Sequence, residues 1–594
     1  MKAFAAFALA FLILRPPIAP GQVPKGAWKV GIAQIRVEER MSENQAKILR
    51  FLRQATEESC RVVVFPESAL SGASNAGAAD LDRALAEIRK AAASANVYVI
   101  LAGKSDSTPP GRSRNWMAAI DPSGKDLLRY DKLYDRPSAE MPRPFAIDGT
   151  PCNAMICADR WLRGVEELPI MEGAAVSFEL SDNYESEWVA ALGWYWYVPR
   201  ALRNGVYVVF ANTVGPDRHG HSAVVAPDGS VVAAAGTEER LLTAMIDPAK
   251  ATRSEATSRR GHPVVGRFWE AGLKILGGEA EKAQPAEPYG SPEVEVRLAA
   301  AQMACSSDMA ANLATMSALI KEAADGGADA VVLPELAVTG AREEDVLRAD
   351  EAALAKALDH LRENARRCKI TAVFGMPWMD RGRRTNSAFA VGPDGAVLTR
   401  ADELAGDRTE LFAAGSAARA MWFRLKGVPA VVTVGRDGLW SEIAELTSAA
   451  GAQLRFHLSY DASTGEPASL RRLQIWANLA SYGTFTATVN AASPEGLRSP
   501  SAPADGGSAL WEDLQARVES RLAMKGERRE GHDRMAIYSP FSANCLERAG
   551  SPPRLLFATQ RVNRNNPHKS AGKNPRMAPW YALGARLLSA GPSF

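Results

Sequence analysis

The chain has 594 residues, which is too long for a single hydrophobic core and predicts two to four domains. Hydrophobic residues make up 46% of it and charged residues 23%, the proportions of an ordinary globular protein. The net charge of +2 gives no reason to expect nucleic acid or an anionic membrane as a partner, and no apolar run after residue 20 is long enough to span a bilayer.

The first 21 residues differ in character from the rest. Lys2 precedes an apolar stretch over residues 3–14, which Arg15, two prolines and small residues follow. A positive start and an apolar centre too short to span are typical of a signal peptide, although residues 17–22 lack a clean Ala-x-Ala cleavage site. We therefore expect a secreted or periplasmic protein that has no membrane partner after signal removal. The alternative is a cytoplasmic protein with a frayed apolar N-terminus.

The elements that follow alternate in type. Residues 28–35 predict a strand, residues 44–58 a helix, and residues 61–67 a second strand that ends at Glu67. Further on, strands run into turns at residues 121–124 and 227–229, which are rich in Pro, Asp and Gly and typical of hairpins. The sequence thus predicts an α/β fold, a layered sandwich rather than a doubly wound sheet.

The same marks recur in the second half of the chain. Gln34 is followed after ten residues by Asn44 and after 33 by Glu67, and Gln302 is followed at the same intervals by Asn312 and Glu335. We predict a tandem repeat with these parts: signal peptide 1–21, catalytic domain 27–276, linker 277–293, second domain 294–565 and C-terminal tail 566–594. The linker is rich in Glu, Ala, Pro and Gly.

Three apolar runs in the first half each end on an ionisable residue: Glu67, Lys132 and Cys157. A thiol nucleophile, a carboxylate base and a cation at the developing oxyanion are what hydrolysis of an amide requires. The backbone N–H of Ala158 is a candidate second oxyanion donor. This chemistry needs neither metal nor cofactor, and the six cysteines are scattered without a zinc or disulfide pattern.

These segments resemble the carbon–nitrogen hydrolase, or nitrilase, superfamily, with its Glu-Lys-Cys triad. The resemblance rests on residues 64–67 (VFPE), 130–133 (YDKL) and 156–160 (ICADR), in family order. It implies two tandem nitrilase-like α-β-β-α sandwich domains and a thioester acyl-enzyme. Many members carry another glutamate after the lysine, for which Glu140 is the candidate. The aromatic stretch 188–197 either lines an acyl pocket or packs in a core or dimer interface.

The resemblance implies hydrolysis of a non-peptide C–N bond in a small amide, carbamoyl amine or nitrile. Amidase activity is favoured because amidases dominate the superfamily. Acyl transfer to an amine through the same thioester remains an alternative, although the lipoprotein acyltransferases of this superfamily have multi-span membrane domains. A secreted, non-catalytic binding protein is the other alternative, and the intact triad argues against it.

The second half lacks the reactive groups. By the spacing of its marks, Gly435 stands where Cys157 stands in the first half, and Glu403 replaces Lys132. Glycine has no nucleophile, and a glutamate beside Glu335 would repel an oxyanion. We therefore predict a non-catalytic copy. Since nitrilase-like domains commonly associate in pairs, the resemblance implies that this copy pairs with the first half as an intrachain pseudo-dimer. A ligand of its own is the alternative, and a homo-oligomer of whole chains also stays open.

Overall fold

The structure is a computed structural model that describes residues 26–71, 77–105, 114–136, 140–183, 197–216, 218–279, 288–406, 408–415, 418–460, 484–492, 508–511, 545–548, 554–562 and 577–589. The predicted signal peptide 1–21 lies outside these residues, and so does the aromatic stretch 188–197 except for Tyr197. Among the helices in the described ranges, none combines the length and apolarity needed to cross a membrane.

The chain divides into two compact units. Unit 1 contains residues 1–261, 269–282 and 570–580, and unit 2 contains residues 262–268, 283–569 and 581–594. The change of unit after residue 282 falls within the predicted linker. Part of the predicted tail is helical, since α15 spans Ala578–Leu587. Another helix, α7, spans Gly266–Leu276 before the predicted linker.

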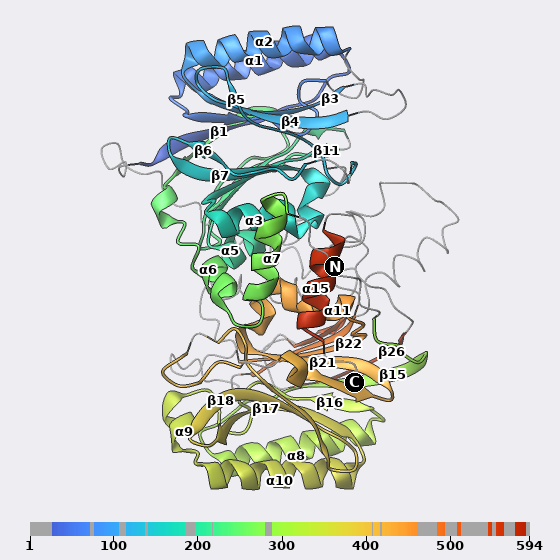
Figure 1. The fold of residues 1–594 in the computed structure, drawn as a ribbon. Helices are drawn as coiled ribbons and strands as arrows, with labels where there is room; N and C mark the ends of the chain where they lie inside the picture. Colours follow the sequence, from blue (N-terminus) through green and yellow to red (C-terminus); the bar gives the residue numbers. More distant parts are fainter. Residues whose placement is uncertain are drawn as a thin grey trace. The chain divides into compact units, whose positions relative to one another are not determined.

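The first sheet of unit 1 has six strands, and helices α1 (Met41–Glu57) and α2 (Ala78–Ala95) cover one of its faces (Figure 1). The apolar residues of α1 recur at helical spacing and pack into one core with strands of the sheet. The strand order is β14 (Arg240–Ile246), β1 (Trp28–Gln34), β2 (Val62–Val64), β3 (Tyr98–Ser105), β4 (Arg114–Ile120), β5 (Asp126–Asp131).

The second sheet of unit 1 also has six strands, with α3 (Arg163–Glu172), α5 (Val198–Asn204) and α6 (Ser254–Gly261) beside it (Figure 1). Its central strands β8 and β9 are buried throughout because both of their faces are covered. The order is β13 (Val231–Ala234), β12 (Ala223–Val225), β9 (Tyr207–Ala211), β8 (Val176–Leu180), β7 (Thr150–Ile156), β6 (Phe145–Ile147). A small hairpin adds β10 (Val214–Gly215) and β11 (Arg218–His219).

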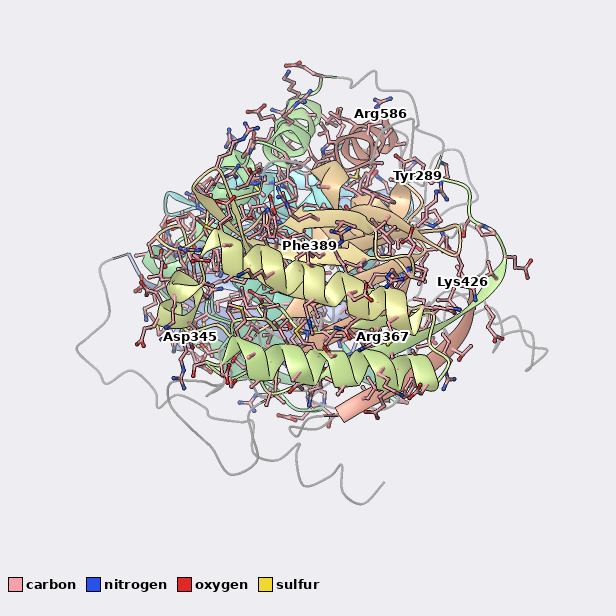
Figure 2. All side chains as sticks on the ribbon, turned by 90° about the horizontal axis from the view of Figure 1, so that it is seen from below. Tyr289, Asp345, Arg367, Phe389, Lys426 and Arg586 are labelled. Atoms are coloured by element: carbon pink, nitrogen blue, oxygen red, sulfur yellow. The ribbon has the colours of Figure 1, made fainter. Side chains whose placement is uncertain are left out.

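Unit 2 repeats both sheets. Helices α8 (Met309–Asp325) and α10 (Glu351–Cys368) lie side by side over the first of them, as Figure 2 shows, and α9 (Glu343–Arg348) and α11 (Ser441–Ala449) complete the layers. The first sheet has the order β19 (Val397–Asp402), β18 (Arg383–Val391), β17 (Thr371–Asp380), β16 (Ala330–Val332), β15 (Val294–Gln302), β26 (Arg554–Val562). The second has the order β20 (Trp422–Leu425), β21 (Val428–Val434), β22 (Leu454–Ser459), β23 (Phe485–Asn490), β24 (Ala509–Trp511), β25 (Cys545–Arg548).

The two units therefore share one architecture, strand for strand. The repeated glutamine makes an equivalent hydrogen bond in each unit. The Gln34 side-chain oxygen accepts from the Ser222 N–H at 2.8 Å, and the Gln302 oxygen accepts from the Ser508 N–H at 2.9 Å. The predicted fold class, two tandem α-β-β-α sandwiches, is confirmed. The predicted turns join β4 to β5 and β12 to β13 as antiparallel pairs.

Candidate active site

Glu67 lies just beyond β2 in unit 1, at a sharp bend where the next residue, Ser68, has a φ of 61°. The Glu67 side chain is only 5% exposed. Its Oε1 accepts hydrogen bonds from Asn115 Nδ2 at 2.6 Å and from Lys132 Nζ at 2.9 Å. Burial raises the pKa of the Glu67 carboxyl, but the charge of Lys132 and these two hydrogen bonds outweigh it, so the pKa lies below its usual value.

Lys132 follows β5 directly, and its N–H donates to the Asn115 carbonyl at 2.8 Å. The same asparagine thus holds the backbone of the lysine and the side chain of the glutamate. Burial lowers the pKa of Lys132, but interaction with Glu67 and Cys157 raises it by more, so the net shift of the pKa is upward. Lys132 is therefore a permanent buried cation.

Cys157 ends β7 and opens a short 3₁₀ turn over Cys157–Trp161, with a φ of 43° in the left-handed region. Its Sγ lies 3.9 Å from Asn183 Oδ1. Burial raises the thiol pKa to about 12, with Glu67 adding to the rise and Lys132 opposing it. Cys157 is free, as are four other cysteines in the described residues.

Tyr130 and Asp159 brace the strand that carries the nucleophile. The Tyr130 hydroxyl accepts from the Ile156 N–H at 2.8 Å and donates to Asp159 Oδ2 at 3.1 Å, while Asp159 Oδ1 accepts from the Tyr134 N–H at 2.8 Å. Burial raises the pKa of Asp159 to about 7. These contacts tie the segment that bears Lys132 to the one that bears Cys157. Nothing in the sequence pattern of either segment predicts this connection.

A buried ionic network lies next to the nucleophile. Arg160 pairs with Glu179 and donates to Asn183 Oδ1 at 3.1 Å, and Arg200 pairs with both Glu179 and Glu166. Because each of these charges is partnered, the network can remain ionised in the interior. Asn183 was not predicted, although it stands three residues beyond β8, as Glu67 stands three residues beyond β2.

The remaining predicted residues lie as follows. Glu140 is exposed, and in the part of the chain that the structure describes it makes no hydrogen bond or ion pair. Asp135 Oδ2 instead lies 3.8 Å from Lys132 Nζ. Ala158 is the second residue of the 3₁₀ turn, directly after the nucleophile. The structure therefore joins Glu67 and Lys132 by a hydrogen bond and ties the segment of Cys157 to that of Lys132 through the Ile156–Tyr130 hydrogen bond. Glu140 lies outside this group.

The corresponding residues of unit 2 are also buried and close together. Asn386 Nδ2 donates to Glu335 Oε1 at 2.7 Å and to Glu403 Oε2 at 2.9 Å, so it holds two carboxylates where Asn115 holds a carboxylate beside an ammonium. Gly435, with a φ of 56°, opens a 3₁₀ turn over Gly435–Leu439. Among the described residues of either unit, no group of three or more His, Cys, Asp or Glu is arranged to hold a metal ion.

Comparison with known proteins agrees with this geometry. The family model for carbon-nitrogen hydrolase matches residues 29–255 and again residues 297–475. A "Hydrolase in agr operon" from Staphylococcus lugdunensis is 30% identical over 186 residues, which cover 28% of this chain and 77% of that protein. A "Hydrolase in pqqF 5'region" from Pseudomonas protegens is 27% identical over 224 residues, which cover 33% of this chain and 75% of that protein.

Among solved structures, an amidase from Nesterenkonia sp. is similar at 19% identity, covering 41% of this chain and 99% of that one, with a TM-score of 0.36. A mutant of the amidase from Nesterenkonia sp. AN1, with a covalent acetamide adduct at its active-site cysteine, is 22% identical, covering 45% of this chain and 91% of that one, with a TM-score of 0.37. Because the family model matches both halves and covers more than half of the chain, this protein belongs to the carbon–nitrogen hydrolase family.

Proposed function

We propose that unit 1 is an amidase that hydrolyses a small linear amide through a thioester on Cys157. The observation that carries the proposal is the buried ion pair of Glu67 and Lys132 at 2.9 Å, together with the 2.8 Å hydrogen bond from the Ile156 N–H to Tyr130 that ties the segment of Cys157 to that of Lys132. A carboxylate, an ammonium and a neutral thiol together carry no net charge. In the resting enzyme, the attraction between Glu67 and Lys132 and the hydrogen bond from Asn115 offset the desolvation cost of burying the two charges.

The pKa shifts indicate when the proton moves. The pKa of Glu67 is lowered and that of Cys157 is raised, so the resting state is a carboxylate beside a thiol. Transfer of the thiol proton to Glu67 is uphill until the sulfur begins to bond to the substrate carbonyl carbon. We therefore infer that proton transfer and nucleophilic attack occur together, which restricts thiolate formation to the occupied site.

In each step of the proposed reaction, Glu67 accepts a proton and then returns one. Glu67 takes the thiol proton as sulfur attacks, and Lys132 Nζ with the Ala158 N–H holds the oxyanion. Protonated Glu67 next gives its proton to the leaving amine, which departs and leaves the thioester. Glu67 then takes a proton from water as that water attacks the thioester carbonyl. The tetrahedral intermediate collapses, the C–S bond breaks, protonated Glu67 returns its proton to the thiolate, and a carboxylic acid leaves.

The test is intact-mass measurement of the full chain during turnover of a panel of small linear amides and the matching nitriles. We expect amide turnover and one acyl adduct per chain, located on Cys157 by peptide mapping. Cys157→Ala should form no adduct. Cys152→Ala is the matched control, since Cys152 is a buried thiol on the same strand, and it should keep the adduct. Full turnover in Cys157→Ala would overturn the proposal.

We propose further that unit 2 is a non-catalytic copy. Gly435 offers no nucleophile, and Glu403 brings a second carboxylate near Glu335 in place of a cation. The same mass measurement tests this proposal, because a single acyl group per chain is expected at saturation. An acyl adduct that maps to residues 294–565 would contradict it.

A further inference from the structure

The Glu403 side chain starts from the same point of the fold as Lys132. Its backbone N–H donates to the Asn386 carbonyl at 2.8 Å, as the Lys132 N–H donates to the Asn115 carbonyl at 2.8 Å. Both residues follow the edge strand of the first sheet of their unit, β19 and β5. The two side chains therefore enter equivalent regions of the two units.

Both carboxylate oxygens of Glu403 are held. Its Oε1 accepts from the Arg436 backbone N–H at 2.7 Å, and its Oε2 accepts from Asn386 Nδ2 at 2.9 Å. The side chain is 7% exposed. Asp437 accepts from the N–H groups of Leu404 and Ala405 at 2.8 and 2.9 Å, which fixes the turn just after Glu403. A carboxylate is thus bound at a defined place by donors from two other segments.

That place is the one that a nucleophile would need. A Cβ atom added to Gly435 would lie 2.3 Å from Glu403 Oε1, far inside van der Waals contact. The Arg436 N–H follows Gly435 as the Ala158 N–H follows Cys157. Unit 2 therefore holds a negative oxygen on the donor that corresponds to the oxyanion donor proposed for unit 1.

We propose that unit 2 retains a binding site for a small carboxylate and fills that site with its own Glu403. The glutamate acts as an internal ligand that satisfies the inherited donors and closes the site to acyl substrates. One chain then binds one acyl substrate, in unit 1. This proposal rests on contacts within unit 2 and does not depend on the substrate proposed for unit 1.

The test removes the internal ligand and offers a free one. Glu403→Ala removes a carboxyl group and one further carbon, and acetate supplies these same atoms. In the full chain, we expect Glu403→Ala to lower the unfolding temperature of unit 2 by roughly 3–10 °C, because buried charge-assisted hydrogen bonds are lost. Saturating acetate at constant pH and ionic strength should restore about 2 °C or more in this variant only.

Two controls make the result specific. Glu410→Ala changes an exposed glutamate a few residues further along, and it should neither destabilise the chain nor respond to acetate. Acetamide has the shape of acetate without its charge, and it should restore less than acetate does. The proposal is overturned if Glu403→Ala is as stable as the parent chain, or if acetate and acetamide act equally on every variant.

A conservative variant covers the case in which Glu403→Ala does not fold. Glu403→Gln keeps the shape, but one of its two contacts becomes a donor that faces either the Arg436 N–H or Asn386 Nδ2. We expect a lowered unfolding temperature with retained fold and unchanged turnover in unit 1. An unfolding temperature equal to that of the parent chain would show that no carboxylate is needed there and would overturn the proposal.

Discussion

Units 1 and 2 carry the same sheets in the same strand order, but they differ in the residues at corresponding buried positions, where Cys157 and Lys132 of unit 1 are matched by Gly435 and Glu403 of unit 2. Both units have an asparagine that donates a hydrogen bond to a buried glutamate. Asn115 bonds Glu67 at 2.6 Å, and Asn386 bonds Glu335 at 2.7 Å. The shared strand order and the shared asparagine contact therefore do not require a thiol or a lysine at these positions.

The comparison also separates two ways of burying charge. Unit 1 buries Glu67 against Lys132, and unit 2 buries Glu403 against backbone and amide N–H donors. Near Glu335 the cation comes from Arg408, whose Nη2 lies 3.7 Å from Glu335 Oε1. A carboxylate in this fold can therefore be stabilised either by a full charge or by several dipoles.

The largest expected difference between the units is in the effect of a substitution at Cys157 and at the corresponding Gly435. Cys157→Ala is expected to lower kcat/KM by on the order of 10⁴-fold or more, because covalent catalysis is lost. Gly435→Ala should leave kcat/KM unchanged and lower only the unfolding temperature, because its Cβ meets Glu403. Steady-state kinetics and thermal unfolding of both variants check this, and a matching loss of turnover in Gly435→Ala would contradict it.

The two glutamates offer the next contrast. Glu67→Gln keeps the shape of the base but removes its proton affinity, and we expect kcat to fall by about 10²–10⁴-fold. Lys132→Met should slow acylation by loss of oxyanion stabilisation. Glu335→Gln, the counterpart in unit 2, should leave kcat within about twofold of the parent. Single-turnover acylation rates measure all three, and a large loss in Glu335→Gln would mean that unit 2 takes part in the reaction.

Thiol titration sharpens the description of the resting site. Since burial raises the pKa of Cys157 to about 12, the thiolate is scarce at neutral pH and increases with pH until that value. The iodoacetamide alkylation rate of Cys157 should therefore rise about tenfold per pH unit between pH 6 and 9, without a plateau. Peptide mapping distinguishes it from the other cysteines. A plateau near pH 7 would indicate a preformed thiolate instead.

Asn183 should produce the smallest effect on catalysis. Its Oδ1 lies between the Cys157 thiol and the Arg160 guanidinium, at 3.9 and 3.1 Å, so it positions the sulfur without reacting. We expect Asn183→Ala to lower kcat roughly tenfold, with a smaller change in KM. Asn364→Ala, at a buried asparagine of unit 2, is the control and should leave kcat unchanged. An equal loss in both variants would point to general destabilisation.

Much of this arrangement could be predicted from the sequence. Apolar runs that end on ionisable residues marked the strand ends, and equal spacings marked the repeat, because period and spacing are local properties of the chain. The sandwich and its hairpin turns followed from these patterns. The roles of Glu67, Lys132 and Cys157 remain predictions, which the variants above are designed to test.

What could not be predicted depends on contacts between distant segments. Tyr130 bonds Asp159 across 29 positions and Asn115 bonds Glu67 across 48, and no spacing rule identifies such pairs. The contacts of the Glu403 side chain could not be predicted either, because alignment with Lys132 gives the residue type at that position and not the groups that the side chain meets. The helix α15 was missed because its basic, Pro- and Gly-containing surroundings are typical of a tail, yet Trp580 within it is fully buried.

The left-handed backbone at the start of the 3₁₀ turn has an evolutionary consequence. Cys157 adopts a φ of 43° and Gly435 a φ of 56°, a region that costs a residue with a Cβ about 1–2 kcal/mol and costs glycine almost nothing. A glycine at this position therefore carries less backbone strain than the cysteine of unit 1. For a copy that does not need a thiol there, stability alone would favour glycine.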